Sequence, residues 1–259
     1  MNAAPAITDG RFWIDTSVSA SQLGGVLADV DSVVVLGDSY SSGEGAGTYD
    51  ETTDGGEGDS RCHRSEETYA HAIWGDNTTV IACSGAVTAN FFATQKSGDT
   101  TVAPQLKALR DLMLGDDPPE AVVLSIGGND AGFAPIGARC VYGNYASELI
   151  RPGAYWPAGW RCDQGLEFHW GGARTSTSDA LERAMAIKAD VVDVLRSVDA
   201  AVNDQEALKN RARQVIPIVV VPYPRIVPET PPGNVAPAGC ALGIGGAELA
   251  YVNQFFDTL

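Results

Sequence analysis

The chain has 259 residues, of which 44% are hydrophobic, so it can bury a substantial core and we expect a single domain. Its 17 Lys and Arg face 33 Asp and Glu, and the resulting net charge of −16 leaves no basic face that could neutralise a run of phosphates. We therefore expect no nucleic-acid partner, and a substrate that is neutral or zwitterionic where it binds.

Hydropathy argues against a membrane span. No stretch reaches the roughly 18 consecutive apolar residues that a spanning helix needs, so we expect no transmembrane segment. Residues 1–14 also lack the basic start and long apolar core of a signal peptide.

The five cysteines carry information about compartment. They include no CxxC pair and no histidine at metal-ligand spacing, which argues against a zinc site and favours disulfides. Disulfides require an oxidising compartment, so we expect a secreted or extracytoplasmic protein whose leader lay upstream. The cysteines are Cys62, Cys83, Cys140, Cys162 and Cys240.

In chain order, residues 1–30 carry few large apolar side chains and predict an N-terminal arm, followed by one domain over residues 31–259. Three short apolar runs predict buried strands that empty into loops. These runs are residues 33–36, 121–126 and 215–221. Two segments rich in glycine, residues 44–61 and 137–178, are predicted to be irregular.

Helical periodicity of the apolar residues predicts the remaining elements. It covers residues 103–114, 179–202 and 247–259. Strands that alternate with helices predict an α/β fold, with a central, mostly parallel sheet between two helical layers (three-layer α/β/α). In such folds ligands bind beyond the carboxyl ends of the strands, so the residues that follow the strands are the ones to examine.

A serine follows the first predicted strand. The sequence GDSYSSG at residues 37–43 places Ser39 in a turn flanked by glycines, where a nucleophile would be exposed. The motif is not the G-x-S-x-G elbow of α/β-hydrolases, because Ser41 stands where that elbow has glycine. Taken alone, the motif is equally compatible with a plain turn.

Two further motifs give the serine a context. The sequence ACSGA spans residues 82–86, and GGND spans residues 127–130 directly after the second predicted strand. In this order the three blocks resemble those of the SGNH (GDSL) hydrolase family. The longer forms, GDSYSSGEGAG from residue 37 and CHRS from residue 62, resemble the actinobacterial secreted lipases and esterases of that family. The resemblance covers residues 31–259 and implies an SGNH, flavodoxin-like fold that hydrolyses esters without a cofactor.

The resemblance assigns roles to individual positions. It makes Ser39 the nucleophile, and it gives the backbone N–H groups of Ser39 and Gly85 and the side-chain amide of Asn129 to an oxyanion hole. Donors fixed in advance stabilise the charge that develops on an ester carbonyl oxygen, which is why these residue types suit the task. Without the resemblance, Gly85 and Asn129 would be plain turn residues.

Asp38 and Asp130 lie beside these positions but are predicted to shape the loops by accepting local backbone N–H groups. In the family, the acid that supports the catalytic histidine lies three residues before it in a separate C-terminal motif. None of His63, His71 and His169 has that context, so each is predicted to be a surface or packed residue, with His169 the best substitute.

In the family, the Asp-x-x-His motif follows the helix predicted over residues 247–259. The base is therefore expected beyond residue 259. The resemblance also implies disulfides between Cys62 and Cys83 and between Cys140 and Cys162, and a third from Cys240 to a cysteine close after the histidine. Cys240 would then be unpaired in this chain. A C-terminal truncation would account both for the missing catalytic histidine and for the missing partner of Cys240.

The segment at residues 137–178 contains seven aromatic side chains, which could form a wall or lid for an acyl chain or a sugar. The alternative is a hydrophobic cluster that holds a long loop down. The seven aromatic residues are Tyr142, Tyr145, Tyr155, Trp156, Trp160, Phe168 and Trp170. The acidic stretch at residues 50–59 lacks EF-hand spacing and predicts a solvated loop, so we expect no metal site.

These observations predict a serine ester hydrolase, a lipase or esterase, that acts on a small-molecule ester of a lipid or an acylated sugar. A different class fits the missing histidine, namely a binding or scaffolding module that keeps the fold without catalysis. The oligomeric state is not predicted by the sequence.

Overall fold

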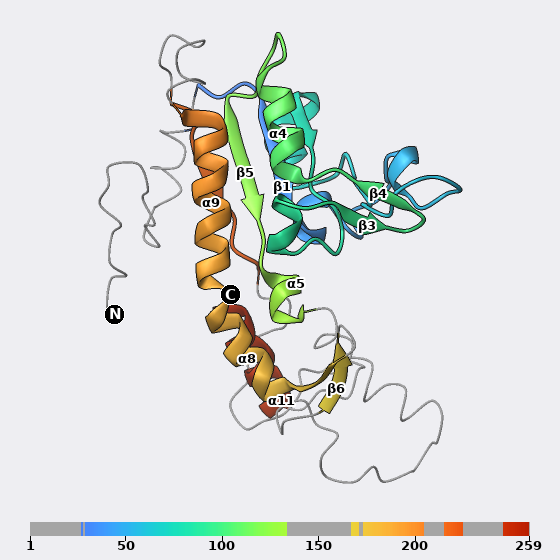
Figure 1. The fold of residues 1–259 in the computed structure, drawn as a ribbon, viewed down its shortest axis with the longest axis vertical. Helices are drawn as coiled ribbons and strands as arrows, with labels where there is room; N and C mark the ends of the chain where they lie inside the picture. The colour runs from blue at the N-terminus through green and yellow to red at the C-terminus, as the bar shows by residue number, and fades with distance from the viewer. Residues whose placement is uncertain are drawn as a thin grey trace.

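The computed structural model describes residues 27, 29–133, 167–170, 173–204, 215–224 and 246–258 (Figure 1). Most of the predicted arm and of the aromatic segment lies outside these ranges. So do three of the five cysteines, Cys140, Cys162 and Cys240.

A parallel sheet of four strands forms the centre of the described fold, in the order β2-β1-β5-β8. Three of the strands match the predicted runs, with β1 extending one residue further, and β2 was not predicted because it is three residues long and begins with two threonines. The strands are β1 (Val33–Gly37), β2 (Thr78–Val80), β5 (Ala121–Ser125) and β8 (Ile218–Val220).

Alternating side chains of β1 and β5 fill two separate cores. Val34 and Leu36 pack on the face covered by α4 (Gln105–Met113) and α9 (Lys188–Asn203), the two helices that run beside these strands in Figure 1. Val33 and Val35 face the opposite side, where the chain around α3 (His71–Trp74) covers them. The predicted three-layer α/β/α fold is confirmed.

The long helix predicted over residues 179–202 is divided in two. Helix α8 (Thr177–Ala186) and α9 meet at Ile187, although the sequence has no proline or glycine there. The backbone bonds continue across the junction, with the Ile187 N–H donating to Arg183 and the Val191 N–H donating to Ile187, both at 3.0 Å. The division is therefore a local change of helix geometry rather than a loop.

The prediction that residues 137–178 are irregular is wrong at their C-terminal end. Strands β6 (Glu167–Trp170) and β7 (Ala173–Ser176) form an antiparallel hairpin there. The sequence carried the signal, because polar and aromatic residues alternate in β6 and two glycines follow it. After the hairpin, α8 packs against α11 (Gly246–Thr258), which matches the helix predicted at 247–259.

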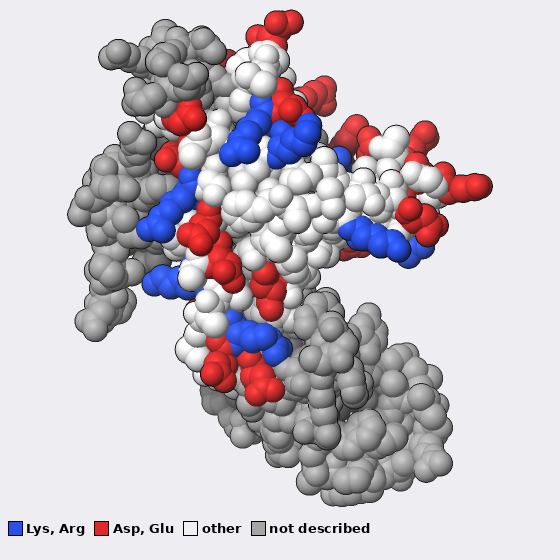
Figure 2. Space-filling model, viewed as in Figure 1, with Lys and Arg blue, Asp and Glu red and all other residues white. Residues whose placement is uncertain are grey.

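Short elements complete the described fold. They are α2 (Ser39–Ser42), η1 (Glu51–Thr53), η2 (Gly75–Asn77), η3 (Thr88–Phe91), β3 (Gln95–Ser97), β4 (Thr100–Val102) and α5 (Gly128–Ala131). None of the described helices is long and apolar enough to cross a membrane. On the face drawn in Figure 2, acidic side chains lie mainly along the borders, and a broad uncharged area lies between them.

Candidate active site

The sheet places the candidate site at the point where its strand order reverses. The chain passes from β1 to β2 on one side, and then to β5 and β8 on the other. In open α/β sheets ligands bind at such a switch point, beyond the carboxyl ends of the strands. The register pairs Gly37 with Ser125, the last residues of β1 and β5. Ser39 and Asn129, which follow these residues, therefore start from the same edge of the sheet.

Ser39 is the first residue of α2 and is half-buried. Asp38 caps this short helix, and its carboxylate accepts the N–H of Tyr40 at 3.1 Å. Gly37 must be a glycine, because its φ is +126° and a Cβ there would lie 2.0 Å from the carbonyl oxygen of Ser125. Gly37 thus fixes the turn before Ser39, and the bond from the Tyr40 N–H to Asp38 fixes it after Ser39.

Asn129 is buried, and its side-chain amide donates to the carbonyl oxygen of Ala86 at 2.9 Å. An asparagine amide has two N–H donors, so one bond can orient the group while the other faces a substrate. Next to it, Asp130 accepts the Thr88 N–H at 3.0 Å and the Thr88 hydroxyl at 2.7 Å. These three bonds, made by the neighbouring residues Asn129 and Asp130, therefore hold the third block against the second block and the residues that follow it.

Gly85 lies exposed in the turn that follows Cys83, with a φ of +76°. A disulfide joins Cys83 to Cys62, which confirms the first of the two predicted pairs. The Ser84 N–H donates to the Cys62 carbonyl at 3.1 Å, and the Gln95 amide donates to the Ser84 carbonyl at 2.8 Å. The disulfide and these two hydrogen bonds thus hold in place the residues that precede Gly85, the candidate oxyanion donor.

Asp38 is almost fully buried and accepts a hydrogen bond from the hydroxyl of Tyr223. Burial raises the pKa of Asp38 to about 6, although the bonds from Tyr223 and Tyr40 act in the opposite direction. Burial also raises the pKa of Asp130, against the bonds from Thr88. The Asp38 carboxyl group accepts an N–H of its own loop, from Tyr40, and also the Tyr223 hydroxyl. The Asp130 carboxyl group accepts the N–H and the hydroxyl of Thr88, which lies in a different loop.

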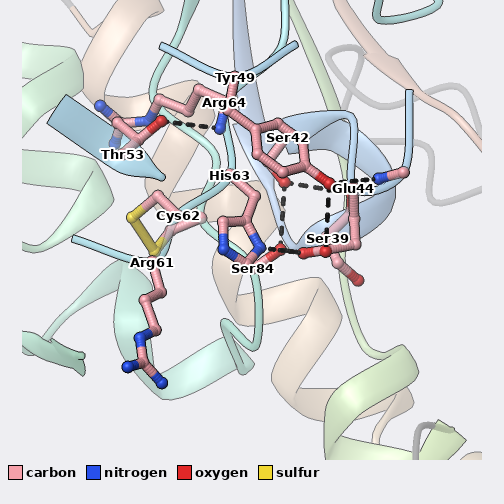
Figure 3. A network of polar contacts seen from close by, with 12 residues as sticks. Ser39, Ser42, Glu44, Tyr49, Thr53, Arg61, Cys62, His63, Arg64 and Ser84 are labelled. Carbon is pink, nitrogen blue, oxygen red and sulfur yellow. Dashed lines mark hydrogen bonds and ion pairs between the residues drawn. A yellow bond between two sulfur atoms is a disulfide. The ribbon is translucent and has the colours of Figure 1, made fainter. Parts of the chain in front are cut away.

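A polar network that the sequence did not predict lies beside the nucleophile turn (Figure 3). The Glu44 carboxylate accepts the Ser84 hydroxyl and pairs with Nδ1 of His63 at 2.7 Å. The ring of Tyr49 stacks on His63, with the ring centroids 4.7 Å apart. Burial alone would raise the pKa of Glu44, but the bonds from Ser84 and His63 lower it overall. Both Glu44 and His63 lie in the extended motifs that resemble the lipases.

The histidines are accounted for as follows. His63 bonds to Glu44, and Nδ1 of His71 lies 2.9 Å from the Thr68 hydroxyl. His169 lies in β6, and its side chain is not among those described. Neither His63 nor His71 is hydrogen-bonded to Ser39, and within the described residues no group of His, Cys, Asp and Glu side chains could hold a metal ion.

Two residues near the site were missed by sequence reasoning. Gln105 is buried at the start of α4, where its side-chain oxygen accepts the Gly37 N–H and its amide donates to the Gly37 carbonyl, both at 2.8 Å. A lone glutamine gives no signal for such a clamp. Tyr223 follows β8, and its place beyond the carboxyl end of a strand was a signal that could have been used.

No family model matches the chain. It is similar to a lipase of Streptomyces rimosus, with 38% identity over 134 residues, which cover 50% of this chain and 40% of that protein. It is also similar to lipase 1 of Streptomyces coelicolor, with 36% identity over 129 residues, covering 48% of this chain and 40% of that protein. The matched segment thus spans less than half the length of either relative.

A solved structure gives a further comparison. The crystal structure of an extracellular lipase from Streptomyces rimosus superposes with a TM-score of 0.49 and 25% identity, over 88% of this chain and 71% of that one. The sequence similarity agrees with the resemblance that the three blocks indicated: over about half of its length, the chain is similar to these two Streptomyces lipases.

Proposed function

We propose that this protein is a serine ester hydrolase, a lipase or esterase, with Ser39 as its nucleophile. The observation that carries the proposal is the convergence of the three blocks at the carboxyl edge of the sheet. Parallel pairing of Gly37 with Ser125 brings the first and third blocks together, and the bond from Asn129 to Ala86 adds the second. The relatedness to Streptomyces lipases supports the same chemistry.

In this proposal the Ser39 hydroxyl oxygen attacks the ester carbonyl carbon as a base removes its proton. The carbonyl oxygen becomes an oxyanion, which receives hydrogen bonds from the N–H groups of Ser39 and Gly85 and from the Asn129 amide. Collapse of this intermediate expels the alcohol, which takes up the proton and leaves an acyl group on Ser39. Water then attacks the acyl group and releases the acid.

The base in this scheme is a histidine whose side chain is not among those described, because neither His63 nor His71 is hydrogen-bonded to Ser39; they contact Glu44 and Thr68 instead. The substrate is an ester of a lipid or of an acylated sugar, and the reaction needs no cofactor. We further propose that the protein works outside the cytoplasm. The Cys62–Cys83 bond and the description of the Streptomyces rimosus lipase as extracellular support that location.

The test is covalent labelling of the full-length protein with a fluorophosphonate, followed by peptide mass spectrometry, together with hydrolysis of p-nitrophenyl butyrate. The expected adduct is on Ser39 and not on Ser41 or Ser42, and Ser39→Ala should abolish both labelling and turnover while the circular dichroism spectrum stays the same. Ester turnover within a few-fold of the parent in Ser39→Ala would refute the assignment.

The alternative is a binding or scaffolding module with the same fold. It is favoured by the lack, among the described side chains, of a histidine bonded to Ser39. A folded full-length protein that neither reacts with the probe nor hydrolyses short or long acyl esters would support this alternative.

A further inference from the structure

Tyr223 contacts both loops of the candidate site. Its hydroxyl donates to Asp38, the residue before Ser39, and accepts the N–H of Gly128, the residue before Asn129, at 3.0 Å. These two contacts reach across 185 and 95 positions of the sequence. A single hydroxyl group therefore joins the nucleophile loop to the Asn129 loop.

The tyrosine ring reinforces the connection. It lies 5.9 Å from the ring of Tyr40, which follows Ser39, with an angle of 47° between the planes. It also packs so closely on Gly128 that a Cβ there would lie 3.0 Å from Cζ of the tyrosine and 3.1 Å from its hydroxyl oxygen. Glycine at this position allows the loop to approach the ring.

The environment makes the hydroxyl bond to Asp38 directional. Asp38 is buried, and its second oxygen is already used by the Tyr40 N–H. A buried carboxylate needs donors, and a tyrosine that donates to it can accept from a backbone N–H at the same time. Burial and the neighbouring Asp38 raise the pKa of Tyr223, so the hydroxyl keeps its proton and remains a donor.

We infer that Tyr223 is a positioning residue that fixes the distance between the nucleophile loop and the loop of the Asn129 oxyanion donor. The inference rests on the proposed function, because the distance matters for catalysis only if Ser39 and Asn129 act on the same ester. Tyr223 acts through Asp38 and Gly128 and does not itself touch the reacting atoms.

The test compares Tyr223→Phe with Tyr69→Phe in the full-length protein. Tyr69 is a matched control because it is also partly buried and lies 5.3 Å from the ring of Tyr40, but its hydroxyl bonds to Ser41 of the nucleophile loop and, within the described residues, to no residue of the Asn129 loop. Ser41 keeps its 2.8 Å bond to Ser125 in that variant. Both substitutions preserve the ring and remove one hydroxyl.

For Tyr223→Phe we expect kcat to fall by about tenfold or more, because small misplacements in an active site carry penalties of that order. KM for p-nitrophenyl butyrate should stay within about twofold, as expected when an interaction of the transition state is lost. Tyr69→Phe should lower kcat by only a few-fold. Asp38→Asn alters the same contact from the other side and should lower kcat in the same way, which provides a second variant if Tyr223→Phe folds poorly.

A second readout does not depend on turnover. In proton–nitrogen NMR spectra, Tyr223→Phe should shift the backbone amide of Gly128 and the side-chain amide of Asn129, and Tyr69→Phe should leave both in place. The pKa of Asp38, followed through the amide of Tyr40, should rise above about 6 when the Tyr223 bond is lost. The other ionisable groups that act on Asp38 or lie near it, Asp130 and Tyr69, are unchanged in this variant.

The two readouts separate failure of the inference from failure of the proposed function. If Tyr223→Phe leaves kcat and the Asn129 side-chain amide unchanged, the inference is overturned even in an active hydrolase. If the parent hydrolyses no ester, the proposed function fails, and NMR alone decides whether Tyr223 links the two loops.

Discussion

Asn129 donates its side-chain amide to the carbonyl oxygen of Ala86 at 2.9 Å, across 43 positions of the sequence. The bond is buried, and it orients the amide beside the turn that carries Gly85. The third block is therefore held by the second rather than by its own loop. The contacts of this and neighbouring residues lead to the measurements below.

Asn129→Ala should lower kcat for p-nitrophenyl butyrate by about 100-fold or more, because it removes one preorganised donor to the oxyanion. It should also reduce stability by about 1–3 kcal/mol, since the Ala86 carbonyl loses its buried partner. Thr88→Val is the control. It removes the hydroxyl bond to Asp130 but keeps Asn129, and should destabilise the protein while kcat changes by only a few-fold. Equal kcat losses in the two variants would contradict an oxyanion role for Asn129.

Asp38→Asn should abolish a pH dependence of stability. The pKa of Asp38 is about 6 in the folded protein against an ordinary value of 3.8, so its contribution to stability is complete below about pH 4 and is lost as the pH rises through 6. The variant does not titrate at this position. Its free energy of unfolding relative to the parent should therefore rise by roughly 2 kcal/mol between pH 4 and pH 7.

Urea unfolding of both proteins across this pH range measures the difference, in which the shifts of Glu44 and Asp50 cancel because both proteins contain them. A difference that stays constant, or that falls as the pH rises, would show that Asp38 ionises without penalty in the folded state.

Gln105→Leu should destabilise the fold by about 1–3 kcal/mol, because it leaves the buried N–H of Gly37 without its acceptor. The Gly37 carbonyl keeps the Cys83 N–H at 3.1 Å, so only one group is orphaned. Gln254→Leu, on an exposed position of α11, is the matched control and should change stability by no more than about 0.5 kcal/mol. Equal effects in urea unfolding would mean that the clamp on Gly37 contributes nothing.

Replacing both Cys62 and Cys83 by alanine should lower the free energy of unfolding by about 3 kcal/mol, the magnitude expected for a bridge that spans 21 positions. Peptide mapping of the 259-residue chain without reductant should recover this pair. The sequence resemblance further predicts a Cys140–Cys162 pair and one free thiol, at Cys240. Recovery of Cys240 in a bridge to any of the other four cysteines would refute that prediction.

The sheet was predictable because its buried strands are continuous β-branched runs, and the loops that follow β1 and β5 were found by looking just beyond those runs. Strand β2 was not predictable in this way, since three residues with two threonines give too little periodicity. The division of the long helix at Ile187 also has no local signal, because no breaker stands there. Tertiary packing decides such features.

The sequence predicted the residues of the candidate site but not the side chains that hold them in place. Ser39, Gly85 and Asn129 stand in motifs, but the side chains that hold them come from elsewhere in the chain. Gln105 and Tyr223 each reach the site through a contact between residues distant in sequence. A single sequence does not reveal such contacts: a lone glutamine gives no signal, and the place of Tyr223 after β8 indicates only that it lies near the carboxyl edge of the sheet.

The parallel pairing of β1 with β5 also has a consequence for folding kinetics. Parallel strands cannot pair through a short hairpin, so their union must wait for the closure of a long loop. Helices form locally and faster. During refolding, the helical signal in circular dichroism should therefore recover before reactivity of Ser39 towards a fluorophosphonate, and the delay would report the time at which the ends of the two strands meet.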